Sequence, residues 1–473
     1  MKFVPFVFLP SLVGAALPPG PGPFGNEIIA QPVPGALEFV NPKVCEVNPS
    51  HNNSNATNAI QSAIDKCGDL AGGGVVLIES SLVLYTASLW LKSNLTLRVA
   101  GKLVGTATGY GNKTDPTNTN ATDAPVVYTR RNSEMMWAHA GLVNGGRCVR
   151  LKDPLAGWDD CAEWSVLENV VLDGGGTLDA NAQGWFLDGQ DDFESAWRPM
   201  MLDLLWVRGL TIRDLEITRP GYWTVHPTFS DNVRVENNSI ITTGSNTDGC
   251  DPDSCWNVYI ARNTFDNGDD CIAIKAGRDW SGLMVNISTR NVLAEQNYYL
   301  KGHGVSIGSE TSGWVTNVTI RDSELDGTAK AVRIKSMRGR GGGVADVVYR
   351  NLTGVVEDAI SLSLNYHEAD PTNDTATPEI RDVVVADLDL RVTDDGSGTR
   401  ALYSSSNYME CLGLNDSIIS NIAFANVKVA LDASDADDLD ASCQYCTGIY
   451  DDDTDPSPCF NATSFSSFST SSS

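Results

Sequence analysis

The sequence is poor in basic residues. Its 473 residues include 33 Lys and Arg against 60 Asp and Glu, which gives a formal net charge of −27. A chain with this charge is repelled by the phosphates of nucleic acids and by anionic membrane surfaces. We therefore expect neither nucleic acid nor a membrane as a partner. Hydrophobic residues still make up 42% of the chain, which suffices for a large core and excludes disorder of the whole chain.

Long apolar runs are also missing, except at the start of the chain. Phe3 to Leu17 is apolar apart from Ser11, follows a lysine and ends in small residues before Pro18. This pattern is typical of a signal peptide, and the stretch is too short to span a membrane comfortably. We predict a signal peptide over residues 1–16 and a secreted, extracellular protein. A buried N-terminal strand is the alternative.

Eleven cysteines and twelve Asn-X-Ser/Thr sequons fit an oxidising, glycosylating route. The local clustering of the cysteines predicts five disulfides and one cysteine left over, although spacing alone does not fix connectivity. The Cys-Gln-Tyr-Cys pair near the end has the spacing of a redox or metal pair, but no second pair accompanies it, so we expect structural disulfides. The predicted bridges are Cys45–Cys67, Cys148–Cys161 and Cys250–Cys255, with two more among Cys411, Cys443, Cys446 and Cys459, and Cys271 is left over.

A short phrase recurs along the chain, in which Val or Ile alternates with polar residues and Asn or Asp closes the unit. Examples begin at Gly209, Asn232 and Asn257, at steps of 23 and 25 residues, and later steps stretch to between 26 and 39. Alternation predicts short strands, and each step has room for three strands that bury their apolar faces by stacking. We predict an all-β fold, a right-handed parallel β-helix. A β-propeller, with repeats of about 40 residues, is the alternative.

The two ends of the repeat differ from its middle. Thr57–Cys67 places Ile60 and Ile64 on one face of an amphipathic helix, which we expect to cap the open end of the coils. After Lys428 the chain becomes acidic and then Ser-rich; a metal-binding acidic loop is the alternative to a solvated tail. The expected domains are a lead-in over 17–54, a catalytic β-helix over 55–430 and an acidic, Cys-containing, Ser-rich tail over 431–473.

Charged residues concentrate where successive coils overlap. In adjacent coils, stacked segments lie about 5 Å apart, so four such segments would share one face. Adjacent Asp269 and Asp270 can serve one cleft only at a turn or bulge, which Gly268 permits. Stacked polar ladders without chemistry explain single Asp residues but not the whole set. The four segments are Asn246-Thr-Asp248, Gly268-Asp269-Asp270, Gly302-His303-Gly304 and Arg333-Ile-Lys335.

Clustered carboxylates suit glycoside hydrolysis. One protonated carboxyl group donates to the leaving oxygen, and an ionised one activates water or attacks carbon. Neighbouring negative charges raise the pKa of the acid member. A Ca²⁺ site is the rival, but Arg333 and Lys335 argue against a bare cation there. We expect no metal and no cofactor.

These four segments, in this order and spacing, resemble the four signatures of the polygalacturonase family, glycoside hydrolase family 28. The resemblance covers about residues 55–430. It implies a β-helix that hydrolyses α-1,4-linked galacturonan with inversion, so that a pectic polysaccharide is the expected partner of a monomeric enzyme. It also implies roles for single residues: Asp269 as general acid, Asp248 and Asp270 as the groups that hold and activate water, His303 as the hydrogen-bond partner of the acid, and Asn246, Arg333 and Lys335 as substrate-binding residues.

Two details separate the chain from many members of that family. The segment before His303 lacks the cysteine that many members pair with the one after Asp-Asp, which leaves Cys271 without that partner. Cys250 and Cys255 in the segment Gly249–Cys255 resemble the branch that trims chain ends, as does the segment Gly308–Gly313, so we expect exo action rather than endo action. Hydrolysis of rhamnogalacturonan or xylogalacturonan is a further alternative. A pectate lyase-like enzyme and a non-catalytic glycan-binding β-helix are more distant ones.

Overall fold

The structure is a computed structural model. It describes residues 42–47, 55–106, 125–151, 161–186, 198–366, 376–393, 407–431 and 440–465. The predicted signal peptide and most of the lead-in lie outside these ranges, as do the last eight residues of the tail. The proposed domain boundaries therefore stay predictions.

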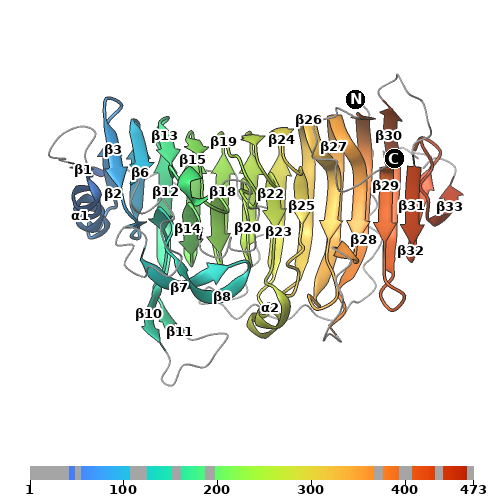
Figure 1. Ribbon diagram of the computed structural model, residues 1–473, viewed down its shortest axis with the longest axis horizontal. Helices are drawn as coiled ribbons and strands as arrows, with labels where there is room; N and C mark the ends of the chain where they lie inside the picture. Colours follow the sequence, from blue (N-terminus) through green and yellow to red (C-terminus); the bar gives the residue numbers. More distant parts are fainter. Residues whose placement is uncertain are drawn as a thin grey trace, which may run out of the picture.

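Parallel strands stack along one axis (Figure 1). One coil contains β20 (Trp256–Ala261), β21 (Thr264–Asp266) and β22 (Ile272–Ile274). The next coil contains β23 (Thr289–Glu295), β24 (Tyr298–Lys301) and β25 (Val305–Ile307). Each strand pairs in parallel with its counterpart in the next coil. The predicted parallel β-helix is confirmed.

The strands form three rows. The first row adds β1 (Lys43–Glu46), β2 (Gly74–Ile78), β5 (Leu95–Val99), β12 (Leu167–Asp173), β15 (Val207–Arg213), β18 (Asp231–Glu236), β26 (Val315–Lys335), β27 (Gly343–Ser363), β28 (Glu379–Val392), β30 (Ile419–Leu431), β32 (Cys446–Asp451) and β33 (Asn461–Phe465). The second row adds β3 (Val83–Thr86), β6 (Lys102–Gly105), β13 (Thr177–Asp179), β16 (Glu216–Thr218) and β19 (Ser239–Ile241). The third row adds β4 (Leu89–Trp90), β9 (Val143–Asn144), β14 (Leu202–Leu205), β17 (Val225–Thr228), β29 (Asn407–Leu412) and β31 (Asp440–Gln444). The long strands β26 and β27 run through all three rows.

The Asn that begins several copies of the recurring phrase has a conformational role. Asn257, Asn291 and Asn317 have φ angles of 52°, 59° and 53°, a left-handed conformation that Asn tolerates better than most residues. Their side chains also bond from coil to coil: Asn257 Nδ2 donates to Asp231 Oδ1 over 2.8 Å. The phrase therefore marks a corner of the coil, where a polar ladder replaces apolar packing.

The core lies inside the stacked coils. Val233, Val258, Val292 and Val318 stand in register in successive coils and are at most 2% exposed. The predicted capping helix is present as α1 (Thr57–Gly68), which buries Ile60, Ala63, Ile64 and Cys67. Packing against β1 and β2 lets this helix cover the open N-terminal edge.

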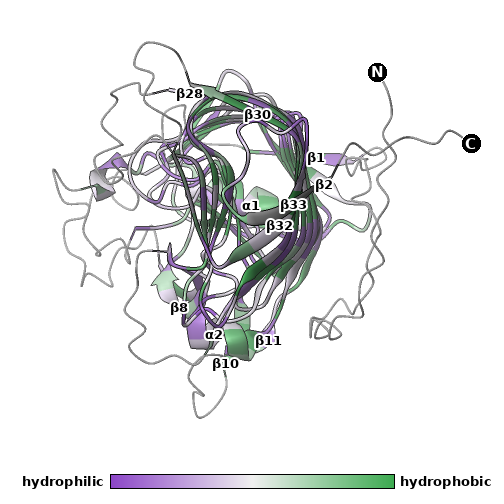
Figure 2. Cartoon of the chain, turned by 90° about the vertical axis from the view of Figure 1, so that its right-hand side faces the viewer, coloured by the Kyte–Doolittle hydropathy of each residue, from purple (hydrophilic) through white to green (hydrophobic). Residues whose placement is uncertain are grey.

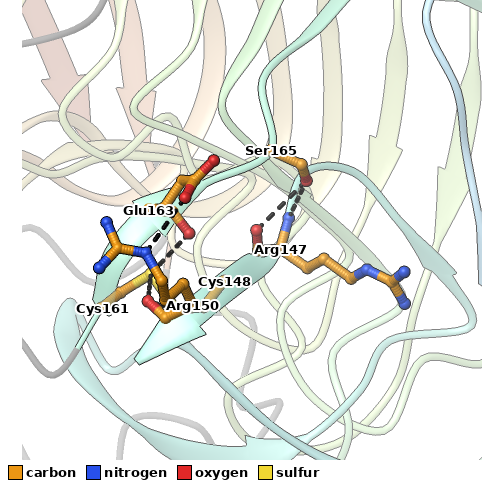
Figure 3. The surroundings of a disulfide bond; sticks show 6 residues. All are labelled: Arg147, Cys148, Arg150, Cys161, Glu163 and Ser165. Carbon is orange, nitrogen blue, oxygen red and sulfur yellow. Dashed lines mark hydrogen bonds and ion pairs between the residues drawn. A yellow bond between two sulfur atoms is a disulfide. The ribbon is translucent and has the colours of Figure 1, made fainter. Parts of the chain in front are cut away.

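Four disulfides confirm most of the cysteine predictions. Two are local, Cys45–Cys67 and Cys148–Cys161, the latter shown in Figure 3. The last four cysteines pair as Cys411–Cys446 and Cys443–Cys459, and Cys271 is free and buried, as expected.

The predicted bridge Cys250–Cys255 is wrong, because both cysteines are free and buried. Cys250 and Asp253 each form a parallel bridge with β17, so the chain between them is extended. An extended chain rises by about 3.3 Å per residue, which carries Cys255 beyond the Cα separation of about 7 Å that a disulfide allows.

Two hairpins and a short helix project from the coils. β7 (Val126–Arg131) pairs with β8 (Glu134–His139), and β10 (Cys148–Leu151) pairs with β11 (Cys161–Trp164). Figure 2, which looks along the stack, shows β8, β10, β11 and α2 (Asp279–Val285) gathered on one side of it. A 3-10 helix covers Gln183–Trp185. In the described ranges, none of the helices is both long enough and apolar enough to cross a bilayer.

Candidate active site

The third row of strands forms the floor of the site. Cys250, Ile272 and Val305 stand in register, are at most 1% exposed and point into the core. Because side chains alternate along a strand, the residues beside them in each coil point outward. Asp248, Asp270 and His303 each lie two residues before one of these core positions, outside the strands, where alternation does not apply. Ser306, which points outward beside Val305, donates to Asp270 Oδ1 over 2.7 Å and stands in register with Arg333. Stacking thus brings the predicted side chains to one outer face.

Asp270 lies deepest and is neutralised by cations. Its side chain is 1% exposed and accepts hydrogen bonds from Arg333 Nη1 over 2.9 Å, Lys335 Nζ over 2.7 Å and Ser306 Oγ over 2.7 Å. Burial alone would raise the pKa of Asp270, but the charges of Lys335 and Arg333 hold it well below its usual range. Asp270 is therefore ionised.

Asp269 is the most accessible of the three carboxylates. Its side chain is 19% exposed and lies 3.1 Å from His303 Nδ1. The backbone N–H of Asn246 donates to Asp269 Oδ2 over 3.0 Å, and that of Asp270 donates to Oδ1 over 2.9 Å. Burial would raise the pKa of Asp269, yet the hydrogen bond with His303 lowers it. The same contacts outweigh burial at His303 and raise its pKa to about 9.

Gly268 lets the turn that carries both aspartates pack against the preceding coil. A Cβ there would lie 2.3 Å from the carbonyl oxygen of Gly244 in the preceding coil, so only glycine permits this approach of the two coils. Asp269 and Asp270 follow in a bend before β22 rather than in the strand itself. The predicted turn is confirmed.

Asp248 behaves as the carboxyl group that holds a proton. It is 3% exposed, and burial raises its pKa to about 7, with a further contribution from the negative charge of Asp269. Asp251, in the same strand segment, is fully buried, and burial and the charge of Asp248 raise its pKa well above the usual range. The expected rise in pKa through neighbouring anions therefore applies to Asp248. The prediction is wrong for Asp269, because the contact with His303 lowers the pKa of Asp269 by more than burial and the neighbouring anion raise it.

Two residues that the sequence analysis missed complete the charge balance. Lys275 Nζ lies 3.8 Å from Asp248 Oδ2, 3.7 Å from Asp251 Oδ1 and 3.1 Å from Glu310 Oε2. Burial would lower the pKa of Lys275 and raise that of Glu310. Their mutual attraction reverses both, so that the pKa of Glu310 falls to about 2. The signal was the alternation of Ile272-Ala-Ile-Lys275, which turns Lys275 outward onto the floor.

Asn246 contributes mainly through its backbone. Its N–H fixes Asp269, and its side-chain Oδ1 accepts a hydrogen bond from Arg198 Nη2 over 3.3 Å. Its φ angle is 55°. The structure thus places Asn246 beside the acidic cluster, where its contact with a sugar stays a prediction.

The β7–β8 hairpin lies beside the floor. Arg130 pairs with Asp253 over 2.8 and 3.0 Å, and both residues are fully buried. Thr129 Oγ1 donates to Asp203 Oδ2 over 2.6 Å, and Arg131 lies 4.0 Å above the ring of Tyr222. Figure 1 shows the hairpin lying along the stack from below β14 towards α2. The hairpin thus contacts the coils that carry Tyr222, Asp253 and Arg278, and 39% of the His303 side chain is exposed.

Three side chains have ligand atoms that a metal ion could use. The ligand atoms of Asp269, Asp270 and His303 lie within 4.8 Å of one another. Arg333 and Lys335 already contact Asp270, so a cation would compete with two fixed positive charges. The same arrangement suits an anionic ligand, which would accept hydrogen bonds from Arg333 and Lys335 in place of Asp270.

Comparison with known proteins gives one consistent result. The profile of "Glycosyl hydrolases family 28" matches residues 156–447. A "Probable polygalacturonase" from Vitis vinifera is 27% identical over 301 residues, which cover 62% of this chain and 58% of that protein. The chain therefore spans less than two thirds of this relative. An "Endo-polygalacturonase" from Pectobacterium carotovorum subsp. carotovorum is 29% identical over 71% of this chain and 77% of its own.

Among solved structures, one of a "hyperthermoactive Exopolygalacturonase" from Thermotoga maritima superimposes with a TM-score of 0.69 at 22% identity, covering 84% of this chain and 90% of that one. At this identity the match supports the right-handed β-helix and leaves the mode of attack to be argued from the site.

Proposed function

The chain belongs to glycosyl hydrolases family 28, and we propose that it is a secreted enzyme that hydrolyses α-1,4-galacturonosidic bonds of pectin or polygalacturonate with inversion, acting from a chain end. The observation that carries this proposal is the meeting of Asp248, Asp269 and Asp270 beside Arg333 and Lys335 on one outer face. A polyanion needs such a local cationic site on a protein whose net charge is −27.

Arg333 and Lys335 bind the carboxylate of the sugar. In the free enzyme they neutralise Asp270. A uronate carboxylate that enters the site competes for the same donors, because guanidinium and ammonium groups bind carboxylates wherever these lie in reach. The negative charge of Asp270 is then less fully neutralised, which raises the pKa of the carboxyl cluster, so the cluster keeps its proton to a higher pH.

The three carboxyl groups of Asp248, Asp269 and Asp270 together hold one proton below about pH 7, which rests on Asp248 in the free enzyme, while the buried Asp251 beside them has a raised pKa of its own. In the complex this proton passes to Asp269, the most accessible carboxyl group, which donates it to the leaving glycosidic oxygen. Asp248 and Asp270, then both ionised, orient and deprotonate the attacking water. His303 holds Asp269 in place through the ion-pair contact of 3.1 Å between its Nδ1 and Asp269 Oδ1.

The β7–β8 hairpin supports exo action. Its buried pair of Arg130 and Asp253 and the contact of Arg131 with Tyr222 fix it beside the coils that carry Tyr222 and Asp248. In our proposal the hairpin blocks a long polymer, which then enters with one end against it and extends over β25 and β26. A chain end is then the only part that reaches Asp269.

Product analysis tests the proposal. Polygalacturonate is incubated with the enzyme, and product sizes, viscosity and ultraviolet absorbance are followed together. We expect galacturonate monomer from the earliest time points, a slow loss of viscosity and no absorbance from an unsaturated product. A ladder of oligomers with rapid loss of viscosity would contradict exo action, and an unsaturated product would contradict hydrolysis.

A further inference from the structure

Beyond Lys275, which is paired with Asp248, Asp251 and Glu310, the cations of the described floor lie in one coil. Lys330, Arg333 and Lys335 all lie in the last part of β26. Lys330 Nζ is paired with Asp358 Oδ2 at 2.5 Å, whereas Arg333 and Lys335 contact Asp270. The positive charge that can meet a uronate is therefore provided by Arg333 and Lys335 alone in this part of the described floor.

The next two coils carry hydroxyl groups and a carboxylate at the same positions. Arg333 stands in register with Ser361 of β27, and Ser361 stands in register with Glu410 of β29. At the second outward position, Lys335 stands in register with Ser363, and Ser363 stands in register with Leu412. Beyond β26, the floor positions in register with Arg333 and Lys335 thus carry two hydroxyl groups in β27, and a carboxylate and an apolar side chain in β29.

Glu410 is held in place but not neutralised. It is partly exposed, and Ser361 Oγ donates to its Oε2 over 3.0 Å. In the part of the chain that the structure describes, no Lys, Arg or His lies within ion-pair distance of Glu410, although other carboxylates on this face do have such partners. A negative charge therefore faces the space two coils past Arg333.

The spacing of the coils relates this charge to the substrate. Neighbouring strands lie about 4.8 Å apart, which is similar to the advance of one sugar along an extended polysaccharide. A chain that binds one uronate at Arg333 and lies along the floor places its second following unit over Glu410. A free uronate there would bring two carboxylates together, whereas an uncharged unit offers only hydroxyl donors or an ester.

We propose that Glu410 is a specificity-determining residue that selects an uncharged unit, either methyl-esterified galacturonate or a neutral sugar, two units beyond the uronate held by Arg333 and Lys335. This inference rests on the proposed function. The preferred substrate is accordingly a partly esterified or interrupted galacturonan rather than a fully ionised one.

Glu410→Gln tests the proposal, because the amide keeps the size of the side chain and its hydrogen bond with Ser361 while removing the charge. Values of kcat/KM are measured on digalacturonate, on tetragalacturonate and on its methyl ester at low salt. We expect wild-type enzyme to prefer the ester. The substitution raises kcat/KM for free tetragalacturonate on the order of tenfold and leaves digalacturonate, which is too short to reach β29, unchanged. Added salt reproduces part of this gain in the wild type.

Glu324→Gln is the matched control, since this exposed residue of β26 lies in the second row of strands, away from the floor. Equal effects of the two substitutions, or no effect of Glu410→Gln on the free tetramer, would overturn the role of Glu410.

Equilibrium binding of the same oligomers to Asp269→Asn protein, with and without Glu410→Gln, separates the two proposals. Absence of any hydrolysis by the wild type would refute the proposed function, while the binding difference would still decide the role of Glu410; if neither oligomer binds, both proposals fall.

Discussion

Replacing Glu310 by Gln is expected to shift the alkaline limb of the pH–rate profile to lower pH. In our mechanism kcat/KM falls above about pH 7, because the carboxyl cluster of the free enzyme loses its proton from Asp248. Lys275 lowers the pKa of Asp248, and Glu310 counteracts Lys275 from 3.1 Å. Without the charge of Glu310, Lys275 favours the ionised form of Asp248 more strongly, so the proton leaves at a lower pH.

The size of the shift follows from the geometry. Glu310 Oε2 lies 3.1 Å and Asp248 Oδ2 lies 3.8 Å from Lys275 Nζ, so the two carboxylates are within about 7 Å of each other. At an effective dielectric constant of about 20, two unit charges at this distance interact by roughly 2 kcal/mol. Since one pKa unit corresponds to about 1.4 kcal/mol, we expect a downward shift of about 1.5 units.

The assay is the pH dependence of kcat/KM on digalacturonate, measured for wild type, Glu310→Gln and Lys275→Met. Lys275→Met removes the cation and is expected to shift the limb in the opposite direction, to higher pH. Glu163→Gln serves as control, because this side chain is 59% exposed and pairs with Arg150 on the remote β10–β11 hairpin (Figure 3). An upward shift or an unchanged limb in Glu310→Gln would refute the assignment of the limb to Asp248.

Three further substitutions test other parts of the site. Asp269→Asn should lower kcat on the order of 10³-fold, as the loss of a general acid does, with an unchanged circular dichroism spectrum; unchanged turnover would remove the acid role. Lys335→Ala should raise KM for polygalacturonate at least tenfold with a smaller effect on kcat, and an equal effect on neutral glycans would contradict recognition of the sugar carboxylate. Arg130→Met removes the guanidinium partner of the buried Asp253 carboxylate, which keeps His226 at 3.8 Å and the N–H of Gly277 at 3.1 Å, and should lower the free energy of unfolding by about 3 kcal/mol; an unchanged midpoint in denaturant would show that this pair does not hold the hairpin.

The sequence carried enough information to predict the coils and the shared face of the site. Both depend on local rules that repeat. Alternation fixes which side chains point outward, and residues such as Asn257 and Asn317, which tolerate a positive φ, mark the corners. Once the coils stack in register, Asp248 and Asp270 must lie in neighbouring coils. The roles of these residues in catalysis stay predictions.

The pairing of the cysteines was harder to predict where the backbone is extended. Cys250 and Cys255 are close in sequence, but residues 250–253 are extended, so the chain moves away from Cys250 before it reaches Cys255. Short spacing favours a disulfide only where a turn brings the two Cα atoms together, as in the hairpin that joins Cys148 to Cys161. A strand assignment for residues 250–253 would have excluded the bridge.

The electrostatic state of the site was not predictable from spacing. Asp269 and Asp270 are adjacent and similar in sequence context, yet their environments differ because His303 contacts mainly one and Lys335 contacts the other. Burial, which opposes ionisation of both, is a property of the packed coils. The pKa values of Asp248 and Asp269 therefore differ for reasons that only the three-dimensional arrangement contains.

The mode of attack depends on an even less local feature. The β7–β8 hairpin is fixed by Arg130, which lies 123 residues before its partner Asp253 and belongs to an insertion outside the repeat. A fully buried ion pair needs both partners, because either charge alone would be desolvated without compensation. The hairpin and the floor are thus stabilised only together. In our proposal the four motifs carry the cleavage chemistry, whereas the hairpin determines which part of the polymer reaches them, so the mode of attack is argued from the hairpin and not from the motifs.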